Sequence, residues 1–256
     1  MNNIPLHAPL FPPSLEYGSD DAEGISLLVE ADEAAVRHLL KPTPFEFVSA
    51  HAWIEVIVLR SAFGVQPFAG GGVIIPARYR GTVGGYYAFC YVDTDDALAL
   101  GREPFGYPKK LGPAGLQRTG RATTAFMKGR TWAVEVSVVI SNEPASQPTV
   151  PRYPHLLLQA FPSAETPEVL LKRVIARDTA AASRMSASTG EGALTIPGTP
   201  GNELAWLDGS KPLYASYARG AFRGALGRVL GTEELGSELL RELGTAERRS
   251  AARKAV

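Results

Sequence analysis

Two adjacent lysines, Lys109 and Lys110, have the clearest chemical potential in the chain. They lie in the stretch GREPFGYPKKLG, residues 101–112. A lysine side chain ordinarily has a pKa of about 10.4, so only about one molecule in a thousand carries a free amine near pH 7. Apolar burial or a second cation lowers that pKa, and the stretch offers both, with Tyr107 and Leu111 as apolar neighbours. A free amine at Lys109 would attack a carbonyl group and form an imine.

The same pair has a second interpretation, because two neighbouring ammonium groups usually lie on a solvated face. In an extended strand, successive side chains point to opposite faces. If Lys109 points inward, Lys110 then points away, and desolvation lowers the pKa of Lys109 more than repulsion does. On residue chemistry alone, the exposed pair and the imine-forming lysine both stay open.

Glu55 is a further candidate for chemistry, on the predicted strand HAWIEVIVL at 51–59. It shares a strand face with Trp53, Ile57 and Leu59, and the opposite face is apolar as well. A carboxylate in such surroundings is desolvated unless it is paired. Glutamates with a raised pKa often serve as acid–base catalysts. The alternative is a structural glutamate that bonds to the backbone or to an arginine.

The elements that must position these residues are mostly short, alternating segments that predict strands. The predicted strands cover residues 25–30, 51–59, 71–76, 84–92, 131–141, 155–161, 168–176 and 202–207. A helix is predicted at 31–41, with Asp32 as its cap, and a second one from about Arg219 into the tail. Residues 186–203 form the most loop-like interior stretch.

Many strands, turns rich in proline and glycine and no strand–helix alternation predict an α+β fold that is mostly antiparallel β. We expect a barrel-like sheet with a few peripheral helices. No shift in composition marks a linker, which predicts a single domain over residues 1–256 with a charged helix or tail at about 233–256.

The composition argues against several functional classes. Lysine plus arginine and aspartate plus glutamate number 26 each, so no basic footprint for nucleic acid is present. The chain has one cysteine, Cys90, and four histidines without metal-ligand spacing. Dinucleotide, phosphate-loop and serine-elbow motifs are absent from the sequence. No secretory signal or membrane span is evident. We therefore expect a cytoplasmic protein with no metal, cofactor, nucleic-acid partner or membrane partner.

The stretch GREPFGYPKKLG resembles the signature of the acetoacetate decarboxylase family. Weaker similarity extends over PLHAPLFPPS, ADEAAVRHLLKPTPFEF, HAWIEVIVL and RYPHLLLQAFP. The resemblance implies a strand-rich cone or barrel with the lysine inside, assembled as a homo-oligomer and acting on a small keto acid. It implies Lys109 as the imine-forming lysine, Lys110 as the neighbour that perturbs its pKa, and Glu55 as an acidic residue of the pocket.

The chain also departs from the family's pattern. The resemblance implies an arginine near the N-terminus, yet the first arginine or lysine is Arg37. It also implies a second glutamate, which would fall near Gly70, and there is none between Glu55 and Glu103. The residues that would hold the substrate in their place are Arg60, Gln66, Arg78 and Tyr107.

The resemblance and these departures imply a carbon–carbon lyase that forms a Schiff base with a small keto acid. The missing residues would handle carboxylate and protons, so we expect a reaction other than standard acetoacetate decarboxylation. A pyruvate aldolase-dehydratase or hydratase that uses the same imine is the alternative. A second alternative, of another class, is a non-catalytic barrel that binds a small molecule.

Overall fold

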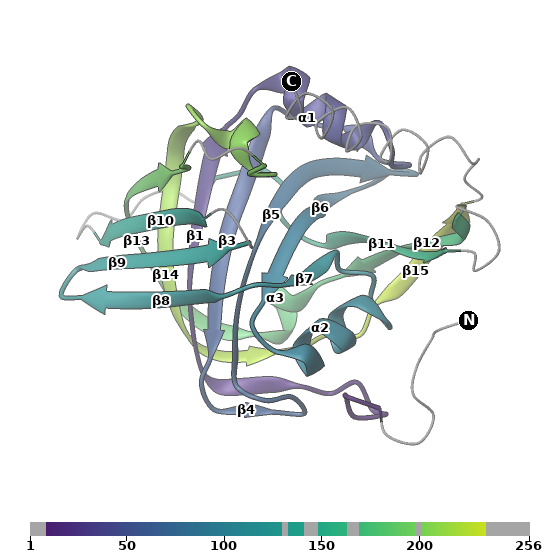
Figure 1. Cartoon of the computed structure of the whole chain (residues 1–256), viewed down its shortest axis with the longest axis horizontal. Helices are drawn as coiled ribbons and strands as arrows, with labels where there is room; N and C mark the ends of the chain where they lie inside the picture. The colour runs from purple at the N-terminus through teal and green to yellow at the C-terminus, as the bar shows by residue number, and fades with distance from the viewer. Residues whose placement is uncertain (1–8, 130–132, 141–147, 163–168, 198–200, 234–256) are drawn as a thin grey trace, which may run out of the picture.

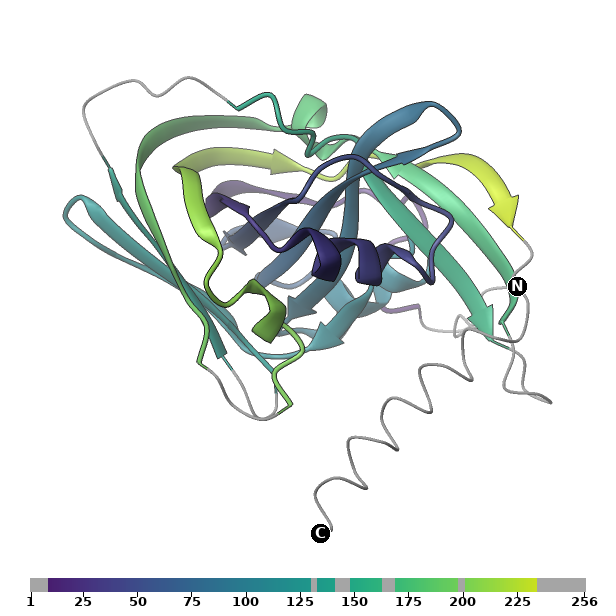
Figure 2. The ribbon, with the colours of Figure 1, turned by 90° about the horizontal axis from the view of Figure 1, so that it is seen from above.

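The computed structural model describes residues 9–129, 133–140, 148–162, 169–197 and 201–233. Fifteen strands in these residues form one sheet, with the order β15–β12–β11–β6–β5–β3–β1–β14–β13–β10–β9–β8 and with β2, β4 and β7 beside that path. The sheet is mostly antiparallel and curls without closing (Figure 1 and Figure 2). The prediction of a mostly antiparallel fold with few helices is confirmed, and the sheet is an open curl with β15 and β8 at its two ends.

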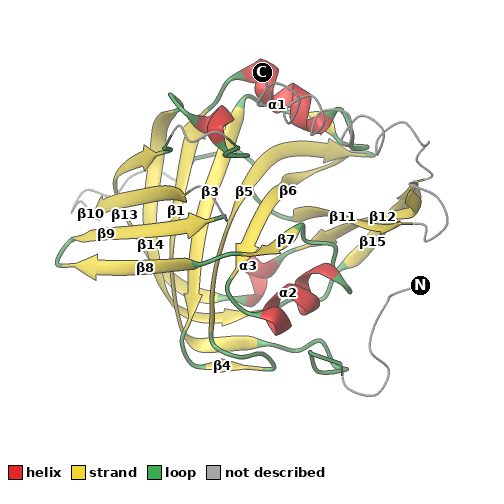
Figure 3. Ribbon diagram, in the orientation of Figure 1, coloured by secondary structure: helices red, strands yellow, loops and turns green. Residues whose placement is uncertain are grey.

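The strands and helices have the following bounds. The strands are β1 (Gly18–Glu30), β2 (Glu46–Phe47), β3 (His51–Leu59), β4 (Ala62–Phe63), β5 (Phe68–Tyr79), β6 (Thr82–Val92), β7 (Lys109–Leu111), β8 (Ala114–Thr119), β9 (Ala122–Lys128), β10 (Ala133–Ile140), β11 (His155–Pro162), β12 (Val169–Arg177), β13 (Arg184–Thr195), β14 (Lys211–Arg223) and β15 (Arg228–Glu233). The helices are α1 (Glu33–Leu40), α2 (Asp95–Arg102), α3 (Thr179–Ala182) and the 3-10 turn η1 (Ala205–Leu207). Figure 3 shows how few helices flank the strands.

The central strands are buried on both faces, which explains their apolar character. Leu27 and Ile54 pack with Val136 of β10 in one core cluster, inside the curl. Leu28 and Trp53, their neighbours in sequence, belong to a second cluster on the other face. Because side chains alternate along a strand, the same strands pack into a hydrophobic core with one face and can line a site with the other face.

Most of the predicted elements are confirmed. The seven predicted strands from 25–30 to 168–176 correspond to β1, β3, β5, β6, β10, β11 and β12. Helix α1 begins after Asp32, whose side chain accepts a hydrogen bond from the Ala35 N–H. The described residues do not include 131, 132 and 141 of one predicted strand, residue 168 of another, 198–200 of the predicted loop or the tail from 234 onward.

Three predictions are wrong. Residues 202–207 contain η1 rather than a strand, and the expected loop at 186–203 is largely β13. The helix expected from Arg219 is instead the end of β14, where Arg219 pairs with Glu23 of β1. Helix α2 was not predicted from the sequence. No helix in the described ranges is long and apolar enough to cross a membrane.

Candidate active site

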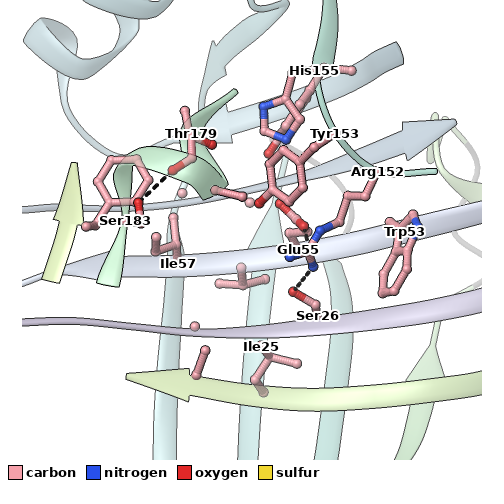
Figure 4. A pocket seen from close by; sticks show the side chains of 18 of the residues that line it. Ile25, Ser26, Trp53, Glu55, Ile57, Arg152, Tyr153, His155, Thr179 and Ser183 are labelled. Atoms are coloured by element: carbon pink, nitrogen blue, oxygen red, sulfur yellow. Dashed lines mark hydrogen bonds and ion pairs between the residues drawn. The ribbon is translucent and has the colours of Figure 1, made fainter. Parts of the chain in front are cut away.

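A cavity of about 530 Å³ lies against the second face of the central strands. Strands β1, β3, β5 and β6 supply one wall. The segment before β11, the start of β11, the end of β12 and helix α3 supply another wall (Figure 4). Because these walls come from distant parts of the chain, the cavity exists only in the assembled fold.

The register of the sheet brings the predicted chemical residues into one row. Lys109 of β7 pairs with Cys90 of β6, which pairs with Gly72 of β5. Gly72 pairs with Glu55 of β3, which pairs with Ser26 of β1. Residues opposite one another across a sheet share a face. Lys109, Cys90, Glu55 and Ser26 accordingly all line the cavity.

Lys109 is held in a largely apolar part of the cavity. Its Nζ donates a hydrogen bond to the Ala97 carbonyl at 2.7 Å and lies 5.3 Å from the centre of the Phe68 ring. It forms no ion pair with a carboxylate in the described part of the chain. Burial, the largest cause, holds the pKa of Lys109 below its ordinary value. The arrangement therefore favours a free amine, which is the nucleophilic form of a lysine.

The glycines of the stretch at 101–112 explain how the amine is placed. A Cβ atom at Gly101 of α2 would lie 2.4 Å from Cδ and Cε of Lys109 and 2.8 Å from its Nζ. Gly106 has a φ of 79°, and a Cβ there would lie 2.6 Å from the Gln159 nitrogen. Only glycine allows helix α2 and the following turn to approach the lysine and β11 so closely.

Lys110 points away from the cavity, as strand alternation requires. Its Nζ lies 2.5 Å from the Glu203 carboxylate, and its side chain is 58% exposed. The Tyr91 hydroxyl also donates to Glu203, on the same side. The sequence led us to expect Lys110 as the charge that perturbs the pKa of Lys109. In the structure, however, its charge is exposed and already paired.

Glu55 and Arg152 form an ion pair inside the cavity (Figure 4). Arg152 Nη1 lies 2.9 Å from Glu55 Oε1 and donates a hydrogen bond to Ser26 Oγ at 2.8 Å. The Arg152 side chain is 27% exposed and the Glu55 side chain is 16% exposed. The Arg152 guanidinium also lies 5.0 Å from the centre of the Trp53 ring. Burial outweighs the attraction of Arg152, so the pKa of Glu55 is raised above its ordinary value.

The other residues predicted from the sequence divide into two groups. Tyr107 lines the cavity beside Lys109. Arg60, Gln66 and Arg78 are exposed and do not line the cavity. Arg60 pairs with Glu23, Arg78 lies 3.7 Å from Glu46, and the Gln66 N–H donates to Asp96.

Sequence reasoning missed the cations that do line the cavity, Arg152 and Arg177. His155 lines the cavity as well. The His155 Nδ1 lies 2.9 Å from the Tyr107 hydroxyl, and burial, with the two arginines, holds the pKa of His155 well below its ordinary value. The sequence signal that could have identified Arg177 is its place at the end of the strand-like run VLLKRVIAR. Burying a cation in a strand costs free energy, so such a residue is a candidate for a function. No group of metal-ligating side chains occurs in the described ranges.

Comparisons of the sequence identify its relatives. The family model described as acetoacetate decarboxylase matches residues 3–233. An acetoacetate decarboxylase of Clostridium beijerinckii is 34% identical over 108 residues, which are 42% of this chain and 43% of the relative. Acetoacetate decarboxylase 1 of Bradyrhizobium diazoefficiens is 33% identical over 109 residues, 43% of each chain. Both alignments span less than half the length of the relative.

Solved structures share the fold at low sequence identity. An acetoacetate decarboxylase structure matches with a TM-score of 0.77 and 20% identity, covering 89% of this chain and 94% of the other. The enduracididine biosynthesis enzyme MppR, complexed with pyruvate, matches with a TM-score of 0.68 and 18% identity, covering 88% and 93%. The family model covers most of the sequence and the fold agrees with it, so the chain belongs to the acetoacetate decarboxylase family.

Proposed function

We propose that this protein is a lyase that forms an imine between Lys109 and a small keto acid. One observation carries the proposal: a partly buried lysine amine without a carboxylate partner in the described part of the chain faces a cavity that also holds an acid. Family membership supports the same chemistry. The cavity of about 530 Å³ has the size typical of small-molecule sites.

With a 3-oxo acid, the reaction proceeds in four steps. The free amine of Lys109 adds to the ketone carbon, and water leaves as the imine forms. The protonated imine then accepts the electron pair of the bond between the carboxylate and the 2-carbon, and carbon dioxide departs. The resulting enamine takes a proton on carbon, and water hydrolyses the imine to release the ketone and the free lysine. The protein must therefore hold a carboxylate and deliver a proton near the same amine.

Arg152 and Glu55 are suited to these two tasks. Arg152 retains some exposure in the cavity, and a guanidinium binds carboxylates through paired N–H groups. Glu55 has a raised pKa, which suits a group that accepts and returns protons near neutral pH. Lys109 and Glu55 both act electrostatically on Cys90, which lies between them in the register. The Lys109 ammonium lowers the pKa of the Cys90 thiol, and the Glu55 carboxylate raises the pKa of the same thiol.

Condensation of pyruvate with an aldehyde is the second candidate, and the size of the cavity favours it. Pyruvate has six non-hydrogen atoms and would fill less than about 200 Å³, even if each atom took the ~30 Å³ of a liquid water molecule. More than half of the roughly 530 Å³ then remains for a second reactant. The resemblance implies a second glutamate near Gly70, and a Cβ at Gly70 would lie 2.9 Å from Val92 Cγ1, so an acidic side chain there would need rearrangement. Here the pyruvate enamine would attack the aldehyde carbon, and loss of water would give an unsaturated acid.

Reductive trapping tests the proposal. Wild-type protein, Lys109→Met and the matched control Lys110→Gln are incubated with acetoacetate or with pyruvate, reduced with borohydride and weighed by mass spectrometry. We expect a mass increase of one reduced substrate in the wild-type and Lys110→Gln proteins and none in Lys109→Met. Carbon dioxide released from acetoacetate would assign the decarboxylase. An unsaturated acid made from pyruvate plus an aldehyde would assign the condensation. No adduct with either acid would refute imine chemistry and favour a binding protein.

A further inference from the structure

Arg177, the last residue of β12, is the most deeply buried cation of the cavity wall. Its side chain is 2% exposed. Its Nη1 donates hydrogen bonds to the Tyr17 hydroxyl at 3.0 Å and to the Tyr107 hydroxyl at 3.4 Å, and its Nε donates to the Ala225 carbonyl. The guanidinium carbon lies 3.8 Å from the centre of the Phe105 ring. These hydrogen bonds and the contact with the Phe105 ring hold the guanidinium in place.

This burial separates Arg177 from the other cavity arginine. Arg152 is paired with Glu55, but its side chain is 27% exposed and so remains accessible to a ligand. The Nη2 of Arg177 is shielded from solvent and has no hydrogen-bond partner among the residues described, and its other nitrogens are occupied. A substrate carboxylate could not touch it without rearrangement of the wall. Arg177 is therefore better suited to act through its charge than through contact.

The charge of Arg177 is not compensated nearby. In the described part of the chain it forms no ion pair with an aspartate or glutamate, and its contacts are neutral hydroxyls, a carbonyl and an aromatic ring. Arg177 and Lys109 both lie near the Tyr107 ring. The guanidinium carbon lies 5.6 Å from the centre of that ring and Lys109 Nζ lies 5.9 Å from it, so the two cations are at most about 11.5 Å apart.

The charged and titratable groups around Lys109 act in opposite directions. Cys90 of β6, Tyr17 and Asp96 of α2 favour the ammonium form of Lys109, whereas Arg177 of β12 disfavours it. Asp96 is already engaged, because its two carboxylate oxygens accept hydrogen bonds from the N–H groups of Gln66 and Ala97. His155 of β11 reaches this region through the Tyr107 hydroxyl and is neutral at physiological pH. Arg177 is thus the positive charge that opposes Asp96 at the amine.

We infer that Arg177 is a positioning residue for this site: a fixed positive charge beside Tyr107 that adds to burial in favouring the neutral amine of Lys109. It takes the place that the sequence suggested for Lys110. The inference deepens the proposed function, since imine formation needs the free amine, but the charge effect itself does not depend on any substrate.

Competitive labelling measures this effect without catalysis. Trace acetic anhydride acetylates amines at a rate that follows the neutral fraction, and mass spectrometry of the Lys109 peptide gives the midpoint of titration. For a charge at most about 11.5 Å away in a medium of effective dielectric about 20, we expect Arg177→Gln to raise this midpoint by at least about one pH unit. Arg177→Lys, which keeps the charge, should restore most of the wild-type value. Lys110→Gln and Arg173→Gln, the latter on the same strand but not lining the cavity, should leave the midpoint unchanged.

A second measurement uses the unmutated side chain, in case Arg177→Gln does not fold. In protein with ¹⁵N-labelled arginine, the Arg177 side-chain resonance should titrate with the same midpoint as Lys109, and this step should vanish in Lys109→Met. An unchanged Lys109 midpoint in folded Arg177→Gln, or an Arg177 resonance without that step, would overturn the inference. Either result would leave the proposed function intact if borohydride still traps the imine. Absence of trapping with a shifted midpoint would instead refute the function and keep the inference.

Discussion

Removal of Arg152 is expected to raise the pKa of Glu55 further. Arg152 is the charge that opposes burial at this carboxyl, since it lowers the pKa that desolvation raises. Arg152→Met keeps a long side chain against Trp53, whose ring the guanidinium carbon approaches to 5.0 Å, while it deletes the cation. The carboxylate then loses its ion-pair partner but stays buried, so the protonated form of Glu55 becomes more favourable relative to the carboxylate.

The size of this effect follows from the geometry of the pair. The nitrogen and oxygen are 2.9 Å apart, which places the centres of the two delocalised charges about 4 Å apart. At an effective dielectric of about 20, such a pair attracts by about 4 kcal/mol. With side chains 16% and 27% exposed, solvent screening reduces this attraction, and we take the range as about 2 to 4 kcal/mol. At 1.36 kcal/mol for each pH unit, the pKa of Glu55 should rise by about 1.5 to 3 units.

NMR of protein with ¹³C-labelled glutamate carboxyl groups measures this rise directly. The Glu55 signal is assigned by its loss in Glu55→Gln, and its titration is followed in the wild-type protein and in Arg152→Met without substrate. Arg60→Met is the matched control, because Arg60 pairs with Glu23 and does not line the cavity. It should leave the Glu55 titration unchanged.

A shift of the Glu55 midpoint by less than half a pH unit in folded Arg152→Met would contradict this expectation. The ion pair would then contribute little, and Glu55 would owe its protonation behaviour to burial alone. A downward shift would contradict the sign of the argument, since removal of a cation cannot stabilise a carboxylate by direct attraction.

Three further predictions concern the lysine end of the row. Lys110→Gln should leave the rate of imine trapping within about twofold of wild type, because its exposed ammonium pairs with Glu203; a tenfold loss would restore Lys110 as the perturbing charge. Gly101→Ala should cut trapping at Lys109 at least about tenfold while circular dichroism stays unchanged, because the added Cβ would lie 2.4 Å from the lysine side chain; an unaltered rate would mean that the lysine has room to shift. The burial that raises the pKa of Cys90 to about 11 should protect it from iodoacetamide at pH 8 in the native protein but not in urea; rapid native alkylation would show that the thiol is open and ionised.

The sequence allowed prediction of the features that depend on local pattern. Alternation of apolar residues predicted β3 and the face that Glu55 shares with Trp53. The same alternation anticipated that Lys109 and Lys110 point in opposite directions. The glycine-rich run at the end of β14 was misread as helical, because the register with β1 that makes it a strand lies almost two hundred residues away in the chain.

Residues that meet the cavity through tertiary packing could not be predicted in this way. Arg60 and Arg78 lie on or beside central strands, which made them natural candidates for carboxylate binding, yet they pair with Glu23 and Glu46 outside the cavity. Arg152 precedes β11 and reaches across to Ser26 of β1, over 126 positions of sequence. Tertiary structure brings the segment before β11 to β1 and β3, and no local periodicity encodes that approach.

The two cavity arginines show why the position of a charge matters more than its presence. Arg152 is partly exposed and paired with Glu55, so its field beyond the pair is weak and its remaining N–H groups are its useful part. Arg177 is enclosed by tyrosines and Phe105 without a counter-ion in the described ranges, so it has little capacity for contact and its field is its useful part. Arg152 is therefore suited to bind a negatively charged substrate, and Arg177 is suited to favour the neutral amine of Lys109.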